Sequence, residues 1–197
     1  MPLRQAKIER ITKETSIKAK LVVDGKGSAK IKTPINFLNH MLESFAKHGL
    51  FDLELLVKGD IHVDQHHTVE DTGIVLGNAF KKALGDKKGI YRSGSFAYPM
   101  DEALAVVAVD ISGRPFLQFE AEFKRRMCGD LDTDVIEDFF QGFVMGLQAN
   151  VAVHMHIGRS DHHKIEAIFK AFGKAMMMAC MRNSRIGKQV LSTKGKL

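Results

Sequence analysis

The sequence is poor in aromatic residues: none of its 197 residues is tryptophan, and aromatic residues make up only 8% of the total. Proteins that bind single-stranded nucleic acid interleave aromatic and basic side chains, because bases stack on the rings while phosphates pair with the cations. No such interleaving occurs along this sequence. A nucleic-acid partner is therefore not expected, although the formal net charge is +6.

Cysteines and long apolar runs are also scarce. Cys128 and Cys180 are the only cysteines, too few for a disulfide framework and suited to a reducing compartment. Both are expected to be small buried residues. No apolar run reaches the roughly 18 residues that a membrane helix needs, and residues 1–10 lack the apolar core of a signal peptide. We therefore expect a cytoplasmic protein that does not engage a membrane.

Acidic residues are missing from the end of the chain. None follows Glu166, whereas seven lysines and arginines do. Subtracting these seven charges from the total of +6 leaves −1 for the rest of the sequence. The basic charge is thus concentrated in the last helix and the tail, where it could hold a phosphorylated small molecule as readily as a polynucleotide.

Two similar histidine clusters lie 96 residues apart, close to half the chain length. Residues 64–71 read D-Q-H-H-T-V-E-D, and residues 160–167 read S-D-H-H-K-I-E-A. Self-similarity at such a separation indicates an internal duplication. We predict two halves that form one compact unit, the first spanning residues 1–92 and the second residues 93–197 with the basic tail.

Each half is expected to contain the elements β-β-α-β-α. Alternating apolar residues around the turns at 24–27 (D-G-K-G) and 112–115 (S-G-R-P) predict a β-hairpin in each half. Helical spacing of apolar residues follows each hairpin. The predicted class is α/β, in the α+β two-layer form, with two mixed sheets and helices on one face of each. The first helices are expected at 36–45 and 135–143, the following strands at 51–57 and 150–157, and each last helix at its histidine pair.

Adjacent histidines on a helix are poorly placed to bind one ion, because neighbouring side chains diverge by about 100°. His66 and Glu70 share a face at four residues, and His67 and Glu70 do so at three. Two such helices could therefore supply ligands to two different ions. A single cluster could equally be a polar helix start, with Asp64 or Asp161 near the N-cap. The second copy in a matching place favours a dinuclear metal centre.

The expected ligands come from the two clusters and from the helices that precede them. Four protein ligands on each of two ions would leave open positions for water or substrate on an octahedral ion such as Mn²⁺. The strand residue His154 is an alternative to the ligand expected from the helix at 135–143. The eight expected ligands are His40, His66, His67, Glu70, Asp138, His162, His163 and Glu166.

At these residues the chain resembles the imidazoleglycerol-phosphate dehydratases. The resemblance covers almost the whole sequence and includes N-H-M-L (39–42), H-H-T-V-E-D-T-G (66–73), P-M-D-E-A-L (99–104) and S-T-K-G (192–195). It implies a hydro-lyase of histidine biosynthesis that converts D-erythro-imidazole glycerol phosphate to imidazole acetol phosphate. It also implies a duplicated fold like ribosomal S5 domain 2, two Mn²⁺ ions per active site, and a homo-oligomer of 24 subunits with its sites between neighbouring subunits.

The resemblance further implies roles for individual residues. Glu14 corresponds to the acid/base residue near the reacting carbons. The family's metal ligands fall on the eight positions above, where Asp138 replaces a residue that is often histidine, and Ala152 stands where the family tends to have a strand histidine. The resemblance also implies that the substrate phosphate is bound by Arg92, Arg114, Ser192 and Lys194.

The implied chemistry suits these residue types. Dehydration of an unactivated glycerol chain removes a weakly acidic carbon proton and expels hydroxide, so it needs both a base and an acid. An imidazolate ring held between two metal ions can push out the hydroxyl, and no organic cofactor is needed. Two other functions fit the metal ligands: a dinuclear hydrolase of phosphate esters, and a shell protein that stores or senses metal without turnover.

Overall fold

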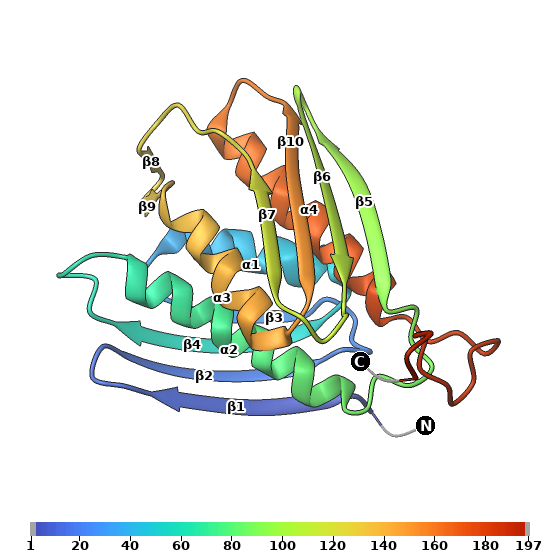
Figure 1. The fold of residues 1–197 in the computed structure, drawn as a ribbon. Coiled ribbons are helices and arrows are strands. Elements are labelled where there is room, and N and C mark those ends of the chain that lie inside the picture. Colours follow the sequence, from blue (N-terminus) through green and yellow to red (C-terminus); the bar gives the residue numbers. More distant parts are fainter. Residues whose placement is uncertain (1–2, 196–197) are drawn as a thin grey trace.

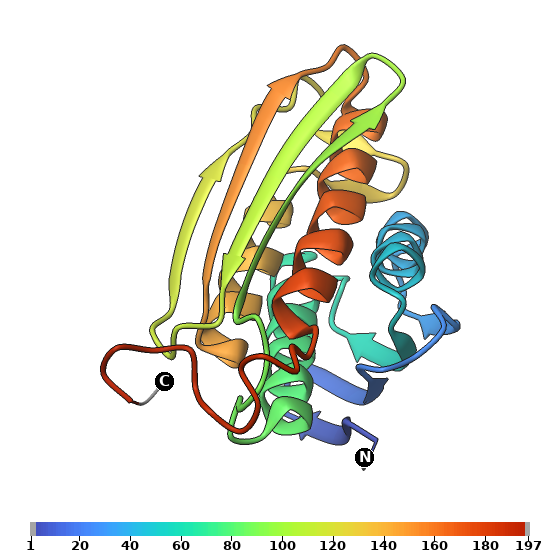
Figure 2. The ribbon, with the colours of Figure 1, turned by 90° about the vertical axis from the view of Figure 1, so that its right-hand side faces the viewer.

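The computed structural model describes residues 3–195, which form two four-stranded sheets with four helices between them (Figures 1 and 2). The first sheet has the strand order β1-β2-β4-β3, and the second has the order β5-β6-β10-β7. The same order thus occurs twice, as expected for duplicated halves. The strands are β1 (Gln5–Ile11), β2 (Thr15–Val22), β3 (Ala29–Lys32), β4 (Asp52–Gly59), β5 (Ser93–Met100), β6 (Ala103–Asp110), β7 (Phe116–Glu120) and β10 (Asn150–Ile157).

The helices cover one face of each sheet and pair across the two halves. Helices α1 (Asn36–Gly49) and α2 (His66–Leu84) belong to the first half, and α3 (Val135–Leu147) and α4 (Asp161–Cys180) to the second. Helix α2 packs on α3, and α1 packs on α4. Their apolar stripes join the inner faces of both sheets in one core, in which eight phenylalanine side chains are fully buried. The α/β two-layer class with duplicated halves is confirmed.

The two predicted hairpins are wrong. β4 lies between β2 and β3, and β10 lies between β6 and β7. In the first half, a carboxylate oxygen of Asp52 accepts the backbone N–H groups of Lys26 (2.8 Å) and Ser28 (3.0 Å). The turn at 24–27 is therefore tied to the start of β4, and β3 continues on the far side of that strand, parallel to it.

The true hairpins join β1 to β2 and β5 to β6. Strands β1 and β5 were not predicted, because both are edge strands with mixed sequences; in β1 only Ala6 is buried. The other expected elements agree with the structure to within a few residues, and β10 matches its expected range. A small ribbon of β8 (Met127–Cys128) and β9 (Leu131–Asp132) precedes α3.

Both cysteines are buried and unpaired, as expected. Among the helices of residues 3–195, none combines the length and the apolar character needed to span a membrane.

Candidate metal centre

The start of α4 and the first turns of α1 bring together three predicted ligands, His40, His162 and Glu166. The Nε2 atoms of His40 and His162 lie 3.7 and 3.3 Å from Oε2 of Glu166, and the three donor atoms lie within 4.8 Å of one another. When two ligand atoms each lie about 2.1 Å from one ion, in directions at right angles, the distance between the two atoms is about 3.0 Å. The spacing in this α4 cluster is therefore close to that of a metal site.

The carboxylate of Glu166 is held in its ionised form by Lys170. Burial raises the pKa of Glu166, but the hydrogen bond and charge of Lys170 outweigh it, and the pKa lies below its usual value. Lys170 Nζ contacts Oε1 at 2.7 Å, which leaves Oε2 to face the two imidazoles. The edge of Phe37 meets the ring of His162, with centroids 5.0 Å apart, and limits its rotation.

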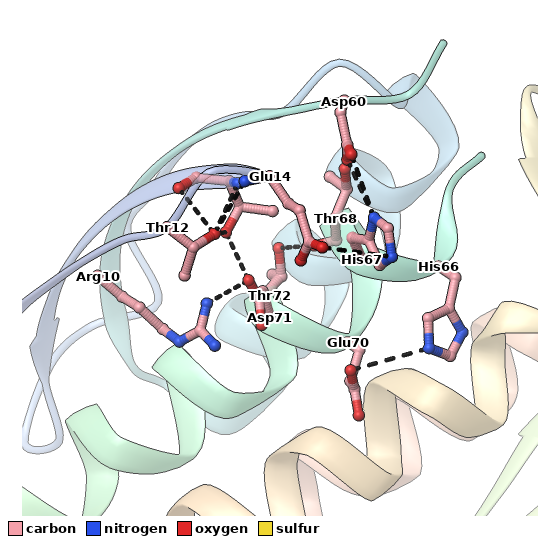
Figure 3. Close-up of polar contacts among 11 residues, drawn as sticks. Arg10, Thr12, Glu14, Asp60, His66, His67, Thr68, Glu70, Asp71 and Thr72 are labelled. Carbon is pink, nitrogen blue, oxygen red and sulfur yellow. Dashed lines mark hydrogen bonds and ion pairs between the residues drawn. The ribbon is translucent and has the colours of Figure 1, made fainter. Parts of the chain in front are cut away.

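A second group of predicted ligands, the α2 cluster, consists of His66, Glu70 and Asp138. His66 Nε2 lies 3.8 Å from Oε2 of Glu70, one turn along α2 (Figure 3). Asp138 reaches the cluster from α3, but its Oδ2 lies 2.9 Å from the other ring nitrogen, Nδ1 of His66. Asp138 thus lies beside His66, and the sequence did not indicate which ring atom it contacts.

Four glycines set the distance between α2 and α3, and Gly73 and Gly142 are two of them. The close approach brings Asp138 to His66. A Cβ added to Gly73 would lie 2.1 Å from the carbonyl oxygen of Phe139, and one added to Gly142 would lie 2.3 Å from that of Glu70. Only glycine permits backbones to approach this closely.

His67 points away from His66, as the helical geometry predicted. The two ring centroids are 6.0 Å apart and the planes are inclined by 76°. His67 Nδ1 lies 3.2 Å from Oδ2 of Asp60, and Nε2 lies 3.9 Å from Oε1 of Glu14 (Figure 3). The hydrogen bond with Asp60 raises the pKa of His67. Glu14, the expected acid/base residue, therefore lies beside a predicted ligand.

His163 has equivalent surroundings in the second half. Its Nδ1 lies 2.7 Å from Oε2 of Glu102, and its Nε2 lies 3.7 Å from Oδ2 of Asp101. The contact with His163 and the backbone N–H of Ser160 lower the pKa of Glu102 to about 2. The sequence analysis assigned no role to Asp60, Asp101 or Glu102. For Asp101 and Glu102, the D-E turn between two alternating strands is the sequence feature that could have indicated a role.

Hydrogen bonds at the helix starts fix both histidine pairs. The backbone N–H of His66 donates to Oδ1 of Asp64 (2.5 Å). Helix α4 is capped by Ser160, whose hydroxyl accepts the N–H of His163 at 3.5 Å. Asp161 is the first residue of the helix and is buried; it accepts the backbone N–H groups of residues 124 and 125 and pairs with Lys164.

The residues expected to bind phosphate lie at the other end of the molecule. Arg92 donates its backbone N–H to the carbonyl oxygen of Ala179, in the last turn of α4. At 1.5 Å per residue, that turn is about 25 Å from His163 in the first turn. The Arg92 side chain pairs with Asp110 (2.6 and 2.8 Å) and donates to the carbonyl oxygen of Leu191 (2.8 Å). The tail that carries Ser192 and Lys194 thus runs beside Arg92 (Figure 1).

Two further predicted positions lie on the second sheet. Arg114, in the turn after β6, accepts a hydrogen bond at its carbonyl oxygen from the Asn150 side chain (2.8 Å) and so belongs to the same end of the sheet as Arg92. His154, the alternative ligand, pairs with Glu120 (2.9 Å) and is exposed on β10, where it alternates with buried Val151 and Val153. It therefore faces away from the helices and from both clusters.

Known proteins resemble this chain over nearly its whole length. The family model described as imidazoleglycerol-phosphate dehydratase matches residues 33–176. The imidazoleglycerol-phosphate dehydratase of Koribacter versatilis is 53% identical over 195 residues, which cover 99% of this chain and 100% of that protein. The Geobacter metallireducens protein of the same name is 54% identical over 194 residues, covering 98% of this chain and 99% of the relative.

Two solved structures agree with this result. The crystal structure of imidazoleglycerol-phosphate dehydratase from Staphylococcus aureus has a TM-score of 0.82 and 36% identity, and the match covers 91% of this chain and 99% of that one. The enzyme from Pyrococcus furiosus in complex with (S)-C348 has a TM-score of 0.84 and 34% identity, with 96% and 100% of the chains covered. The chain is therefore an enzyme and belongs to the imidazoleglycerol-phosphate dehydratase family.

Proposed function

We propose that the chain dehydrates D-erythro-imidazole glycerol phosphate to imidazole acetol phosphate, a step of histidine biosynthesis, at a centre that holds two Mn²⁺ ions. The observation that carries the proposal is the α4 cluster, in which donor atoms of His40, His162 and Glu166 all lie within 4.8 Å of one another. The α2 cluster offers His66 and Glu70 in a similar arrangement. His67 and His163 supply one further imidazole each.

The donor set fits manganese. It consists of imidazole nitrogens and carboxylate oxygens, which suit divalent ions of the first transition row, whereas the two thiols are buried elsewhere. When bound, the ions would act as Lewis acids that lower the pKa of the N–H group of the substrate's imidazole ring. Asp138 contacts Nδ1 of His66, so we propose that it orients this ring for the ion.

Glu14 is proposed to move protons at the reacting carbons. Its carboxylate is exposed and lies beside His67. Hydrogen bonds fix the turn that carries it. Thr12 Oγ1 accepts the backbone N–H of Glu14 (3.1 Å), and buried Asp71 accepts a hydrogen bond from Arg10 (Figure 3). Asp71 also accepts a hydrogen bond from the Thr15 hydroxyl. A carboxylate on such a rigid turn can take a proton from one carbon and return it to the leaving hydroxyl without moving its backbone.

We propose that the substrate phosphate is held by Arg92, Arg114, Ser192 and Lys194. These residues can do so only if they come from a second chain. The substrate carries its phosphate on a short carbon chain, which spans less than about 10 Å at roughly 1.5 Å per bond. The histidines and Arg92 of one chain are about 25 Å apart along α4. We therefore propose a homo-oligomer, with 24 subunits as the expected size, in which one chain binds the ring and a neighbour binds the phosphate. A cytoplasmic location is proposed as well, because two unpaired thiols suit a reducing compartment.

The test is to incubate the protein with imidazole glycerol phosphate and to follow formation of the keto product. A generic phosphate ester serves as the parallel substrate. We expect the keto product and no phosphate release from the ester. Phosphate release without keto product would favour the dinuclear hydrolase, and metal binding without either reaction would favour the storage protein.

A further inference from the structure

Glu102 uses both of its carboxylate oxygens within the protein. Oε2 contacts Nδ1 of His163 at 2.7 Å, and Oε1 accepts the backbone N–H of Ser160 at 2.8 Å. One side chain thus holds the ring of His163 and the N-terminal cap of the helix that carries it. Glu102 reaches this place from a two-residue turn between β5 and β6, in which Asp101 adopts a positive φ of 48°. Two-residue hairpin turns require a positive φ, which aspartate adopts more readily than most residues.

A second carboxylate makes the same contact in the first half. Asp60, just after β4, lies 3.2 and 3.3 Å from Nδ1 of His67. Asp60 is seven residues before its histidine, whereas Glu102 is 61 residues before His163. Because these positions do not correspond in the duplicated sequence, duplication alone does not explain the shared contact. Two unrelated side chains reach the same ring atom of the second histidine in each pair.

The contact determines which ring nitrogen is available. A neutral imidazole that donates its Nδ1–H to a carboxylate keeps an unprotonated Nε2 with its lone pair directed outward. Nε2 of His67 then faces Glu14, and Nε2 of His163 faces Asp101. Both rings remain about one-third exposed, at 36% and 30% of the side chain. When neutral, each histidine is thus fixed in tautomer and direction, and its Nε2 stays accessible.

We infer that Asp60 and Glu102 are positioning residues that hold His67 and His163 by Nδ1 and keep Nε2 ready for an ion. This inference rests on the proposed function, because it assumes that these two histidines are ligands. Carboxylates in this position fix the ring and raise its basicity, and their loss weakens metal binding by about 10- to 100-fold.

The first test is Mn²⁺ binding to Glu102→Gln by calorimetry, with the thermal unfolding temperature measured alongside. Glutamine has one oxygen and one NH₂ group, so it cannot accept from both Ser160 and His163. We expect weaker Mn²⁺ binding, by about 10- to 100-fold, and activity that recovers at high Mn²⁺ concentration. Glu120→Gln is the matched control, because Glu120 makes the same contact, 2.9 Å, with Nδ1 of His154 outside both clusters.

Asp60→Asn keeps the inference testable if the loss of the Ser160 contact unfolds Glu102→Gln. Unchanged Mn²⁺ affinity in these variants, or an equal loss in Glu120→Gln, would overturn the inference. The two proposals fail differently. If the unaltered protein binds Mn²⁺ and the variants bind it more weakly, but no keto product forms, the dehydratase proposal fails and the positioning roles stand. If the unaltered protein is active and the variants bind Mn²⁺ normally, only the positioning roles fail.

Discussion

Asp130 caps the start of α1 by accepting the backbone N–H of Phe37, which lies 93 residues earlier in the chain. Its Oδ1 accepts the backbone N–H of Phe37 at 2.8 Å, and its Oδ2 accepts the N–H and the side-chain amide of Asn36 at 2.7 and 2.8 Å. Ile35, at the N-cap position, offers no side-chain cap of its own. The turn between β8 and β9 therefore stabilises the helix that carries His40.

Replacing this cap should destabilise the protein in a pH-dependent way. We expect Asp130→Ala to lower the free energy of unfolding by about 1 kcal/mol at pH 7. Burial raises the pKa of Asp130, but its hydrogen bonds outweigh this, and the pKa lies below the ordinary 3.8. The stabilisation that ionised Asp130 provides is therefore complete above about pH 4, and it is lost as the pH falls through the lower pKa of the folded state. Urea unfolding at pH 7 and pH 3 should show a larger difference between variant and parent at pH 7.

Asp134→Ala is the matched control for the cap. Asp134 occupies the N-cap position of α3 without a side-chain cap hydrogen bond, so its loss should cost less. Equal losses for the two variants would contradict the role given to Asp130.

The close crossing of α2 and α3 should be sensitive to one methyl group. Gly142→Ala would place a Cβ 2.3 Å from the carbonyl oxygen of Glu70, well inside van der Waals contact, so the helices must separate. We expect a loss of about 1–3 kcal/mol in unfolding free energy and weaker Mn²⁺ binding, because Asp138 moves away from His66. Gln141→Ala, on the exposed side of α3, should leave both quantities unchanged.

Glu14→Gln separates catalysis from metal binding. Glutamine keeps the shape of the side chain but removes its ability to exchange a proton at neutral pH. We expect the turnover rate to fall by about 10²- to 10⁴-fold, with the Mn²⁺ content of the purified protein unchanged. Full activity in the variant would remove Glu14 from the mechanism.

A mixing experiment tests whether one active site uses two chains. Glu14→Gln and Arg92→Ala should each be inactive alone, because one lacks the acid/base residue and the other a phosphate ligand. After joint unfolding and reassembly in equal amounts, about a quarter of the sites should combine intact Glu14 and Arg92 from different chains. Activity that stays at the level of the single variants would mean that one chain supplies both residues.

The sequence predicted the parts of the fold that depend on local periodicity. The spacing of Phe37, Met41 and Phe45 predicted α1, and the alternation around Val151 and Val153 predicted β10. Strand pairing was predicted wrongly because it is non-local. The turn at 24–27 is a real chain reversal, but its hydrogen bonds go to Asp52, and local turn residues do not reveal such a partner.

The sequence was sufficient to propose the ligands of the candidate site. It was less informative about the residues that hold those ligands in place. The repeated H-H-x-x-E pattern is rare enough to single out His66 and His162, and helical geometry correctly predicted that the paired histidines diverge. Asp60 and Glu102 gave weaker signals, because carboxylates are common and the D-E turn does not indicate its partner; Glu102 meets its histidine only through tertiary packing. Asp138 was assigned because it matches the position of His40 in the duplicated half, and its contact with Nδ1 of His66 emerged only from the crossing of α2 and α3.

We propose that the histidine clusters form a metal-dependent dehydratase centre. The most direct measurement is a titration of chelator-stripped protein with Mn²⁺ in the presence of imidazole glycerol phosphate, following the keto product. We expect no turnover without metal and a rise in turnover that levels off at two Mn²⁺ ions per chain. Turnover by the metal-free protein, or Mn²⁺ binding that produces no keto product, would contradict the proposal.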